Sequence, residues 1–295
     1  MSRWDRGERE TSIPDWFWEA VETPATEHRV EVDECDVVYR RWGTPGKPPL
    51  LLIHGMYAHS HWWDFIAPQL TDRCDVAALD LTGMGDSDYR YVYDADTFAQ
   101  EIVAVCDACE FDNHVVIAAH SFGGNMAVKA ANLYPDRFGA LVLLDSGIRD
   151  PDEPIPELPP MGGRPKLYPD KATAQARFRL QPPQSCENAY VLEYIARNSV
   201  LPIDGGYAWK FDDDLPATMK GGERYPEDYA ALSLPLGVIY GADSELFSEQ
   251  TLAYMRRLIP QEFPAVALAD AQHHLFLDQP MAFIAALRGM LETLS

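Results

Sequence analysis

The sequence has no long uninterrupted apolar run. Nowhere in its 295 residues do about eighteen apolar residues follow one another, the minimum for a membrane-spanning helix. The first twenty residues are charged and lack the apolar centre of a secretory signal. We therefore expect no association with a membrane.

Positive charge is also scarce. The chain carries 24 Lys and Arg against 46 Asp and Glu, a net charge of −22. Nucleic acids are bound through basic patches, so we expect no nucleic-acid partner. The same excess of negative charge disfavours a strongly anionic substrate, because like charges repel.

Cysteines are few and odd in number. The five are scattered, which favours reduced thiols and a cytoplasmic location. Cys106 and Cys109 form a C-x-x-C pair, but the pair lies in a helical pattern without a second pair nearby. We expect both thiols to be packing residues, and we expect no metal site.

Short apolar runs alternate with helical patterns along most of the chain. Such alternation predicts a mainly parallel sheet with helices on both faces. Before the first such unit, residues 30–33 and 37–42 alternate between apolar and polar and predict an antiparallel hairpin at the sheet edge. A helix is expected over residues 61–70, and residues 1–28 are expected to form a loosely structured arm.

The alternation is interrupted between residues 148 and 232. Residues 150–169 are rich in proline, and helical patterns are expected near 170–180 and 186–199. We therefore predict a core made of residues 1–147 and 233–295, with residues 148–232 inserted as a helical lid.

Residues 114–130 predict a strand, a sharp turn and a helix, with Ser121 in the turn. β-branched residues without alternation are typical of a strand covered on both faces. At the amino end of the following helix, free N–H groups favour developing negative charge beside Ser121. Ser121 could alternatively be a simple helix cap.

Polar residues collect where the predicted strands end. Parallel sheets bind ligands at the carboxyl ends of their strands, so these residues are candidates for one site. They are His54, Asp80, Ser121, Asp145, Asp243 and His273.

Four motifs together resemble the α/β-hydrolase family. They are the segments 51–64, 78–88, 118–124 and 238–244 with 270–280, in the family's order and spacing. Residues 119–123 are close to the G-x-S-x-G nucleophile elbow, with alanine in place of the first glycine. The resemblance implies a mostly parallel eight-stranded sheet flanked by helices, with a lid inserted.

The resemblance also implies a catalytic triad. Its nucleophile falls on Ser121, and its histidine on His273, because the spacing to Asp278 and Pro280 selects His273 over His274. Gln272 stands where the family usually has glycine. For the acid we favour Asp243, which ends a strand as in most members, over Asp145, since some members carry the acid one strand earlier.

The remaining expected site residues surround this triad. The backbone N–H groups of Met56 and Phe122 are expected to form an oxyanion hole. Four side chains are expected to line the substrate pocket: Tyr57, His120, Trp209 and His274. No metal or organic cofactor is required.

We therefore predict hydrolysis of a small or medium, mainly apolar carboxylic ester through an acyl-serine intermediate. The same triad also serves thioesters, lactones, perhydrolysis and carbon–carbon cleavage of dienone acids. Carbon–carbon cleavage would need a cationic group to bind the substrate's carboxylate. Arg177, Arg179 or Arg197 could supply that group. A non-catalytic ligand receptor is the alternative from another class, and the sequence leaves the oligomeric state open.

Overall fold

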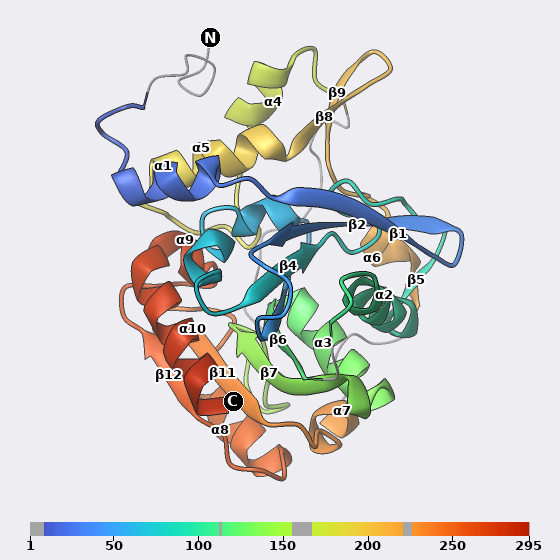
Figure 1. Cartoon of the computed structure of the whole chain (residues 1–295), viewed down its shortest axis with the longest axis vertical. Helices are drawn as coiled ribbons and strands as arrows, with labels where there is room; N and C mark the ends of the chain where they lie inside the picture. The colour runs from blue at the N-terminus through green and yellow to red at the C-terminus, as the bar shows by residue number, and fades with distance from the viewer. Residues whose placement is uncertain (1–8, 112–113, 155–166, 221–225, 295) are drawn as a thin grey trace.

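The computed structural model describes residues 9–111, 114–154, 167–220 and 226–294, and it has a central eight-stranded sheet (Figure 1). The order is β1-β2-β4-β3-β6-β7-β11-β12, and β2 pairs antiparallel with β1 and β4 while the other neighbours are parallel. This confirms the predicted α/β sheet and its edge hairpin. The strands are β1 (Thr26–Val32), β2 (Cys35–Trp42), β3 (Pro49–Ile53), β4 (Asp75–Leu79), β6 (Val115–His120), β7 (Phe138–Leu144), β11 (Leu236–Gly241) and β12 (Ala265–Leu268).

The central strands are apolar throughout because both faces of the sheet are covered. All five residues of β3 and of β4 are buried. Along β3, Leu51 and Ile53 join one core cluster, whereas Leu50 and Leu52 join the other. Side chains alternate between the faces of a strand, so each face has its own apolar core.

Helices cover both faces. The core that contains Leu51 also includes side chains from α2 (Ala95–Ala108), α3 (Phe122–Leu133) and α8 (Glu249–Leu258). The core that contains Leu50 includes side chains from α1 (Asp15–Glu22), α9 (Leu275–Asp278) and α10 (Pro280–Leu294). Helix α1 belongs to the expected loose arm, which is therefore ordered where Phe17 is buried.

Residues 60–70 form two short 3₁₀ helices instead of the single expected helix. They are η2 (Ser60–Trp63) and η3 (Ala67–Leu70). Pro68 lies in the first turn of η3, where it cannot donate a backbone hydrogen bond to a preceding turn. Trp63 and Phe65 are fully buried, so packing of the aromatic side chains determines this segment's conformation.

The region between β7 and β11 contains strands as well as helices. Its described elements are α4 (Lys171–Ala176), α5 (Ala189–Asn198), β8 (Val200–Ile203), β9 (Gly206–Trp209), α6 (Leu215–Thr218), β10 (Met219–Lys220) and α7 (Pro226–Ala230). Strands β8 and β9 form a hairpin, and β10 pairs with β5 (Tyr93–Asp94). Helices α4 and α5 and the hairpin gather at the top of the molecule (Figure 1). Helices α4 and α5 lie where helices were expected, and the strands were not foreseen. The role of the insertion as a lid stays a prediction. The proline-rich stretch lies partly outside the described residues.

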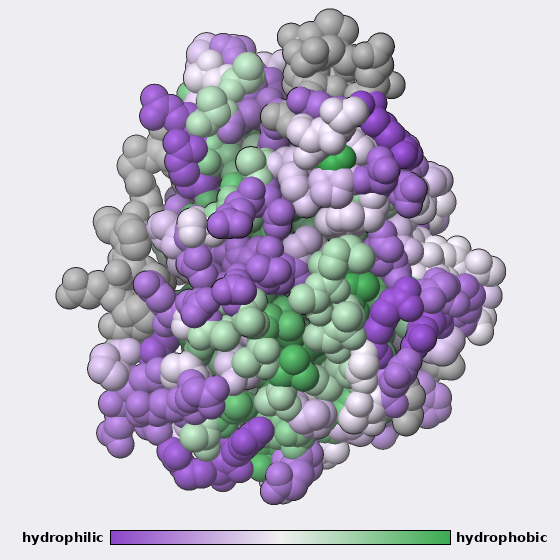
Figure 2. Space-filling view, turned by 90° about the vertical axis from the view of Figure 1, so that its left-hand side faces the viewer, coloured by the Kyte–Doolittle hydropathy of each residue, from purple (hydrophilic) through white to green (hydrophobic). Residues whose placement is uncertain are grey.

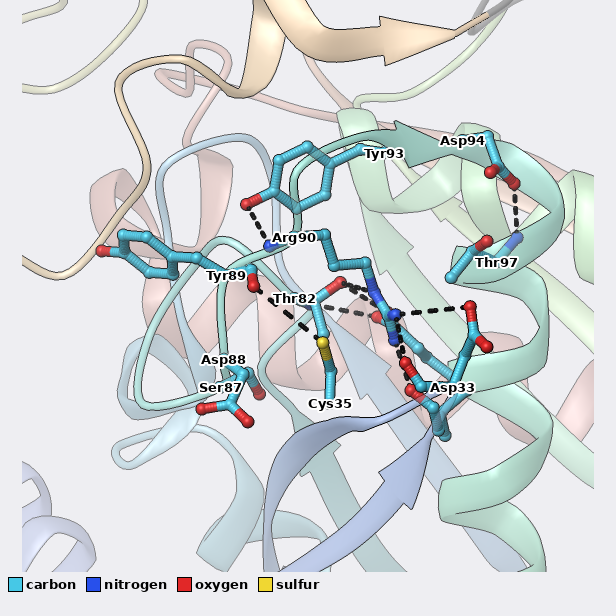
Figure 3. Close-up of polar contacts among 12 residues, drawn as sticks. Asp33, Cys35, Thr82, Ser87, Asp88, Tyr89, Arg90, Tyr93, Asp94 and Thr97 are labelled. Atoms are coloured by element: carbon cyan, nitrogen blue, oxygen red, sulfur yellow. Dashed lines mark hydrogen bonds and ion pairs between the residues drawn. The ribbon is translucent and has the colours of Figure 1, made fainter.

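A loop after β4 connects this region to the core. Arg90 lies between Thr82 and the backbone of Asp33, with its Nε 3.0 Å from the Thr82 hydroxyl (Figure 3). The same Nε lies 3.1 Å from Oε1 of Glu101, which is fully buried on α2. Burial raises the pKa of Glu101, and its bonds to Thr82 and Arg90 oppose that shift.

The same loop also contacts the insertion. The Tyr93 hydroxyl accepts the Arg90 N–H at 3.0 Å and donates to Asp212 Oδ2 at 2.8 Å. Lys210 Nζ lies 2.6 Å from Asp86 Oδ2. These bonds hold residues 210–212 of the insertion against the loop.

On the face drawn in Figure 2, hydrophilic residues surround an apolar area near the lower middle. No helix in the described parts of the chain has the length and apolar character needed to cross a bilayer.

Candidate active site

Ser121 occupies the turn between β6 and α3. It has φ 52° and ψ −119°, a backbone conformation that is costly for a residue other than glycine. Its N–H donates to the Leu144 carbonyl at 3.1 Å, and the Ser146 hydroxyl donates to the Ser121 carbonyl at 2.7 Å. The neighbouring strand β7 therefore supports the strained turn. Such a turn exposes the serine hydroxyl above the end of the sheet.

Two glycines let the loop after β3 approach this turn. A Cβ atom on Gly123 would lie 2.3 Å from the His54 carbonyl oxygen, so only glycine fits there. A Cβ on Gly55 would lie 3.2 Å from Cβ of Ser121. The backbone that leads into Met56 therefore lies beside Ser121.

His273 connects Ser121 to a buried carboxylate. Its Nε2 lies 2.9 Å from Ser121 Oγ, and its Nδ1 lies 2.7 Å from Asp145 Oδ1. Asp145 directly follows β7, has φ 44° and is 3% exposed. With Nδ1–H donating to the carboxylate, Nε2 carries the lone pair that can accept the serine proton.

The carboxylate beside His273 is thus Asp145, and the preference for Asp243 is corrected. Asp243 is exposed, and its backbone N–H donates to the Ala271 carbonyl at 2.9 Å. β7 lies between β6 and β11, so an acid that ends β7 is one strand nearer to Ser121.

The end of β11 and the turn after it donate hydrogen bonds to Asp145. The Gly241 N–H donates to Asp145 Oδ2 at 2.8 Å, and the Ser244 hydroxyl donates to Oδ1 at 2.7 Å. With His273, three donors surround this buried carboxylate and hold its two oxygens in place. The sequence reasoning missed Ser244, whose only signal was its position next to Asp243.

His120 supports the backbone of His273. Its Nε2–H donates to the His273 carbonyl at 2.9 Å, and the two rings lie 4.7 Å apart. Burial, with His273 as the next cause, holds the pKa of His120 well below 6.5, so its ring is neutral. His120 was expected to line the pocket, and the structure places it behind His273.

His274 is also buried, with its ring 5.0 Å from that of His273 and 5.5 Å from that of Trp62. Its backbone N–H donates to Gln184 Oε1 at 2.9 Å. Neither ring nitrogen makes a hydrogen bond of normal geometry. Burial holds its pKa well below 6.5, although the Gln181 and Pro182 carbonyls oppose this.

The spacing to Asp278 has a structural basis. Asp278 Oδ2 accepts the Gln272 N–H at 2.8 Å, and both carboxylate oxygens accept from Gln184 Nε2. Asp278 therefore links the loop before His273 to the insertion. Burial is the main cause that raises its pKa.

The other expected residues lie around this arrangement. Phe122 begins α3, where a backbone N–H has no carbonyl partner within the helix, and Met56 follows Gly55 beside Ser121. Tyr57 has φ 61°, and its ring lies 4.7 Å from Phe211 of the insertion. Trp209 packs within the insertion, and its N–H donates to the Tyr168 hydroxyl at 3.3 Å.

A second serine–histidine contact joins Ser199 to His59, but the serine hydroxyl there points to another acceptor. His59 Nε2 is 2.8 Å from Ser199 Oγ, but the Ser199 hydroxyl donates to the Ile195 carbonyl at 2.8 Å. That proton is therefore directed away from His59. In the described residues, no group of three or more His, Cys, Asp or Glu could hold a metal ion.

Comparison with known proteins identifies the family. The sequence model of the alpha/beta hydrolase fold matches residues 48–280. The chain belongs to the α/β-hydrolase family. Most of the core and the whole insertion lie within this match.

Two curated relatives of this α/β-hydrolase come from Mycobacterium tuberculosis. Lipase LipV is 26% identical over 260 residues, covering 87% of this chain and 98% of the relative. Esterase Rv0045c is 25% identical over 266 residues, covering 86% of this chain and 85% of the relative. Both names support a hydrolase that acts on esters.

Solved structures share the fold. E-2-(acetamidomethylene)succinate hydrolase has a TM-score of 0.75 at 23% identity, covering 91% of this chain and all of that one. Esterase Rv0045c has a TM-score of 0.70 at 21% identity, covering 96% of this chain and all of that one. At these identities the structural likeness concerns the fold alone.

Proposed function

We propose that this α/β-hydrolase cleaves a small or medium, mainly apolar carboxylic ester through an acyl-serine intermediate. The observation that carries the proposal is the chain of contacts from Ser121 Oγ to His273 and on to Asp145, at 2.9 and 2.7 Å. A serine hydroxyl needs an adjacent base to act as a nucleophile at neutral pH. The ester-cleaving relatives support the same reaction class.

Acylation begins with proton transfer from Ser121 Oγ to His273 Nε2. The Ser121 oxygen attacks the ester carbonyl carbon, and the carbonyl oxygen becomes negatively charged. The backbone N–H groups of Phe122 and Met56 are the proposed donors to this oxygen, and removing one such donor typically costs about 3–4 kcal/mol of barrier. His273 then protonates the departing alcohol, leaving the acyl group on Ser121.

Deacylation repeats these steps with water. His273 takes a proton from the water, the hydroxide attacks the acyl carbon, and the proton returns to Ser121 as the acid departs. Asp145 keeps its charge throughout and stabilises the imidazolium formed in each half-reaction. The donors from Gly241 and Ser244 keep Asp145 in place.

An ester is favoured over a dienone acid by the position of the arginines. Carbon–carbon hydrolysis would require a cation facing the substrate carboxylate. Arg177 and Arg179 are exposed on the insertion, and the Arg179 guanidinium donates to the carbonyls of Ala176 and Phe178. Both arginines are thus placed toward solvent or their own backbone, whereas Arg197 on α5, the third candidate cation, is only partly exposed.

Hydrolysis of p-nitrophenyl esters of several chain lengths tests the proposal. We expect the wild type to hydrolyse at least one of these esters. In Ser121→Ala, kcat should be at least about a thousandfold lower. A fluorophosphonate should add covalently to Ser121, as peptide mass spectrometry would show. Ser199→Ala removes the other serine in contact with a histidine and should retain turnover and labelling. Turnover that survives in Ser121→Ala would overturn the proposal.

A further inference from the structure

The turn that follows β3 contains a strained residue. The Ala58 N–H donates to the Gly55 carbonyl at 3.2 Å, which closes a turn of four residues. Tyr57, the third residue of this turn, has φ 61°, whereas φ of Met56 is negative. This combination is a type II turn, whose third position favours glycine or asparagine. The chain therefore holds a bulky tyrosine where its backbone is costly, and such a conformation persists only when its surroundings impose it.

The turn sets the direction of the Met56 N–H, one of the two proposed donors to the substrate's carbonyl oxygen. The Gly55 carbonyl faces the inside of the turn, where it accepts the Ala58 N–H, and it also lies 2.7 Å from His54 Nδ1. In a trans peptide the N–H points opposite to the C=O, so the Met56 N–H points out of the turn. A rotation of the turn would therefore misdirect this donor.

Two neighbours hold Tyr57 in this conformation. Its backbone N–H donates to Sδ of Met84, which is fully buried, at 3.2 Å. Its ring lies 4.7 Å from the ring of Phe211, which belongs to the insertion. Contacts between aromatic rings are favourable, so the tyrosine ring gains from the insertion a stabilisation that a glycine at this position would lack.

Residues 83–85 and 210–212, which carry these two neighbours, are joined to each other. Met84 and Phe211 form an antiparallel bridge, flanked by two backbone hydrogen bonds of 2.8 and 2.7 Å. The ion pair of Lys210 described above lies at the same junction. The Phe211 ring is therefore attached to the core loop that also accepts the Tyr57 N–H, and it is held next to the turn.

We propose that Tyr57 is a positioning residue for the oxyanion hole, and that the insertion, through Phe211, holds the Met56 N–H in the direction that the reaction needs. This inference rests on the proposed ester hydrolysis for the role of the Met56 N–H. A pocket-lining role for Tyr57, as the sequence predicts, is the rival explanation. The two explanations differ in what they predict for phenylalanine, alanine and glycine at this position.

Substitutions of Tyr57 separate the two roles. Tyr57→Phe keeps the ring on Phe211 and should retain kcat within about twofold. Tyr57→Ala loses the ring but keeps the cost of a positive φ, so kcat on a p-nitrophenyl ester should fall about ten- to a hundredfold with little change in KM. Tyr57→Gly also loses the ring, but glycine adopts this backbone freely, so part of the loss should be recovered. A residue that only lines the pocket would give glycine no advantage over alanine.

Phe211 and Tyr207 provide a matched pair in the insertion. Both side chains pack against the same small cluster of the insertion, but the ring that contacts Tyr57 is that of Phe211. Phe211→Ala should lower kcat as much as Tyr57→Ala does. The double variant should lose no more than either single variant, because both remove the same contact. Tyr207→Ala, the matched truncation, should leave kcat within about twofold.

An alkyl trifluoromethyl ketone tests the oxyanion hole itself. Ser121 Oγ adds to the ketone carbon, the serine proton passes to His273, and the ketone oxygen becomes the negative atom that the Met56 N–H would contact. In Tyr57→Ala and in Phe211→Ala, the inhibition constant should rise about ten- to a hundredfold, because such an analogue follows transition-state binding. Binding of methyl hexanoate to Ser121→Ala, where no such oxygen forms, should change less than about twofold when either substitution is added.

Amide hydrogen exchange, measured by NMR, reports on the turn without any reaction. The Ala58 N–H closes the turn, so it should exchange faster in Phe211→Ala than in the wild type or in Tyr207→Ala. Unchanged Ala58 exchange or unchanged kcat in Phe211→Ala overturns the inference. So does a Tyr57→Gly protein no more active than Tyr57→Ala, or a Tyr57→Phe protein as impaired as Tyr57→Ala.

Failure of the proposed function would be recognised separately. In that case the wild type cleaves no ester and fluorophosphonate does not label Ser121. Faster Ala58 exchange in Phe211→Ala would then still support the control of the turn by the insertion, and unchanged exchange would overturn it.

Discussion

Asp145 Oδ1 lies 2.7 Å from His273 Nδ1, although 128 residues separate the two in the chain. The contact fixes which imidazole nitrogen carries the proton. It also shows that the acid of this site ends β7 and not β11.

Replacing the acid should distinguish Asp145 from Asp243. Asp145→Asn keeps the shape of the side chain but removes the charge that stabilises the His273 imidazolium. We expect kcat on a p-nitrophenyl ester to fall by about 10³–10⁴-fold. Asp243→Asn, the matched change at the exposed residue, should alter kcat less than about twofold. A large loss in Asp243→Asn together with an active Asp145→Asn would show that the assignment is wrong.

His120 should act as a positioning residue for His273. His120→Leu removes the donor to the His273 carbonyl while keeping an apolar side chain of similar size. We expect kcat to fall about ten- to a hundredfold with little change in KM, because small displacements of a catalytic group are costly. His120→Gln, which restores an N–H donor, should recover part of the loss. Steady-state kinetics would decide, and unchanged kcat in His120→Leu would contradict the role.

The buried histidines should make the fold sensitive to mild acid. Burial holds the pKa values of His59, His120 and His274 well below 6.5 in the folded protein. Above about pH 6.5 these imidazoles are neutral in both the folded and the unfolded protein. Below that pH they take up protons only in the unfolded chain, so the free energy of unfolding falls. Each histidine contributes up to about 1.4 kcal/mol per pH unit.

Urea unfolding between pH 5 and 7.5 would measure that slope. The free energy of unfolding should decrease as the pH falls below 6.5. His274→Leu removes one of these contributions, so the free energy of unfolding should change less steeply with pH than in the wild type. Equal slopes would mean that His274 is protonated in the folded protein.

The buried pair of Glu101 and Arg90 should be sensitive to loss of one partner. Glu101 is fully buried and Arg90 is nearly so, with 3.1 Å between Oε1 and Nε. Glu101→Leu removes the buried carboxylate beside Arg90 and leaves the exposed carboxylate of Asp33, 3.9 Å from Nη1, to balance its charge. We expect about 3–5 kcal/mol of destabilisation. The double variant Glu101→Leu with Arg90→Met should lose less free energy of unfolding than the two single variants lose together. Additive losses in urea unfolding would show that the two side chains are not coupled.

The fold could be predicted because its signals are local. Apolar runs such as 50–53 and 76–79 indicate strands covered on both faces, and the structure has β3 and β4 there. Ser121 and His273 could be singled out because each lies within a motif of fixed spacing. The roles of the two residues remain proposals, although their side chains meet as expected.

The choice of acid could not be made from local sequence. Asp145 and Asp243 both follow predicted strands, and only the contact between Asp145 Oδ1 and His273 Nδ1, at 2.7 Å in the folded chain, shows which carboxylate meets His273. Hydrogen bonds such as that from His120 to the His273 carbonyl depend on packing between distant segments. The β8–β9 hairpin was missed because each strand has four residues and one contains Pro202.

Two of the three groups of the proposed triad, Ser121 and Asp145, follow the adjacent strands β6 and β7 within one short stretch of chain, whereas His273 follows β12, 128 positions after Asp145. A nascent polypeptide would therefore hold its nucleophile and acid well before it acquires a base. During translation, ester cleavage as proposed here would stay latent until the segment after β12 docks.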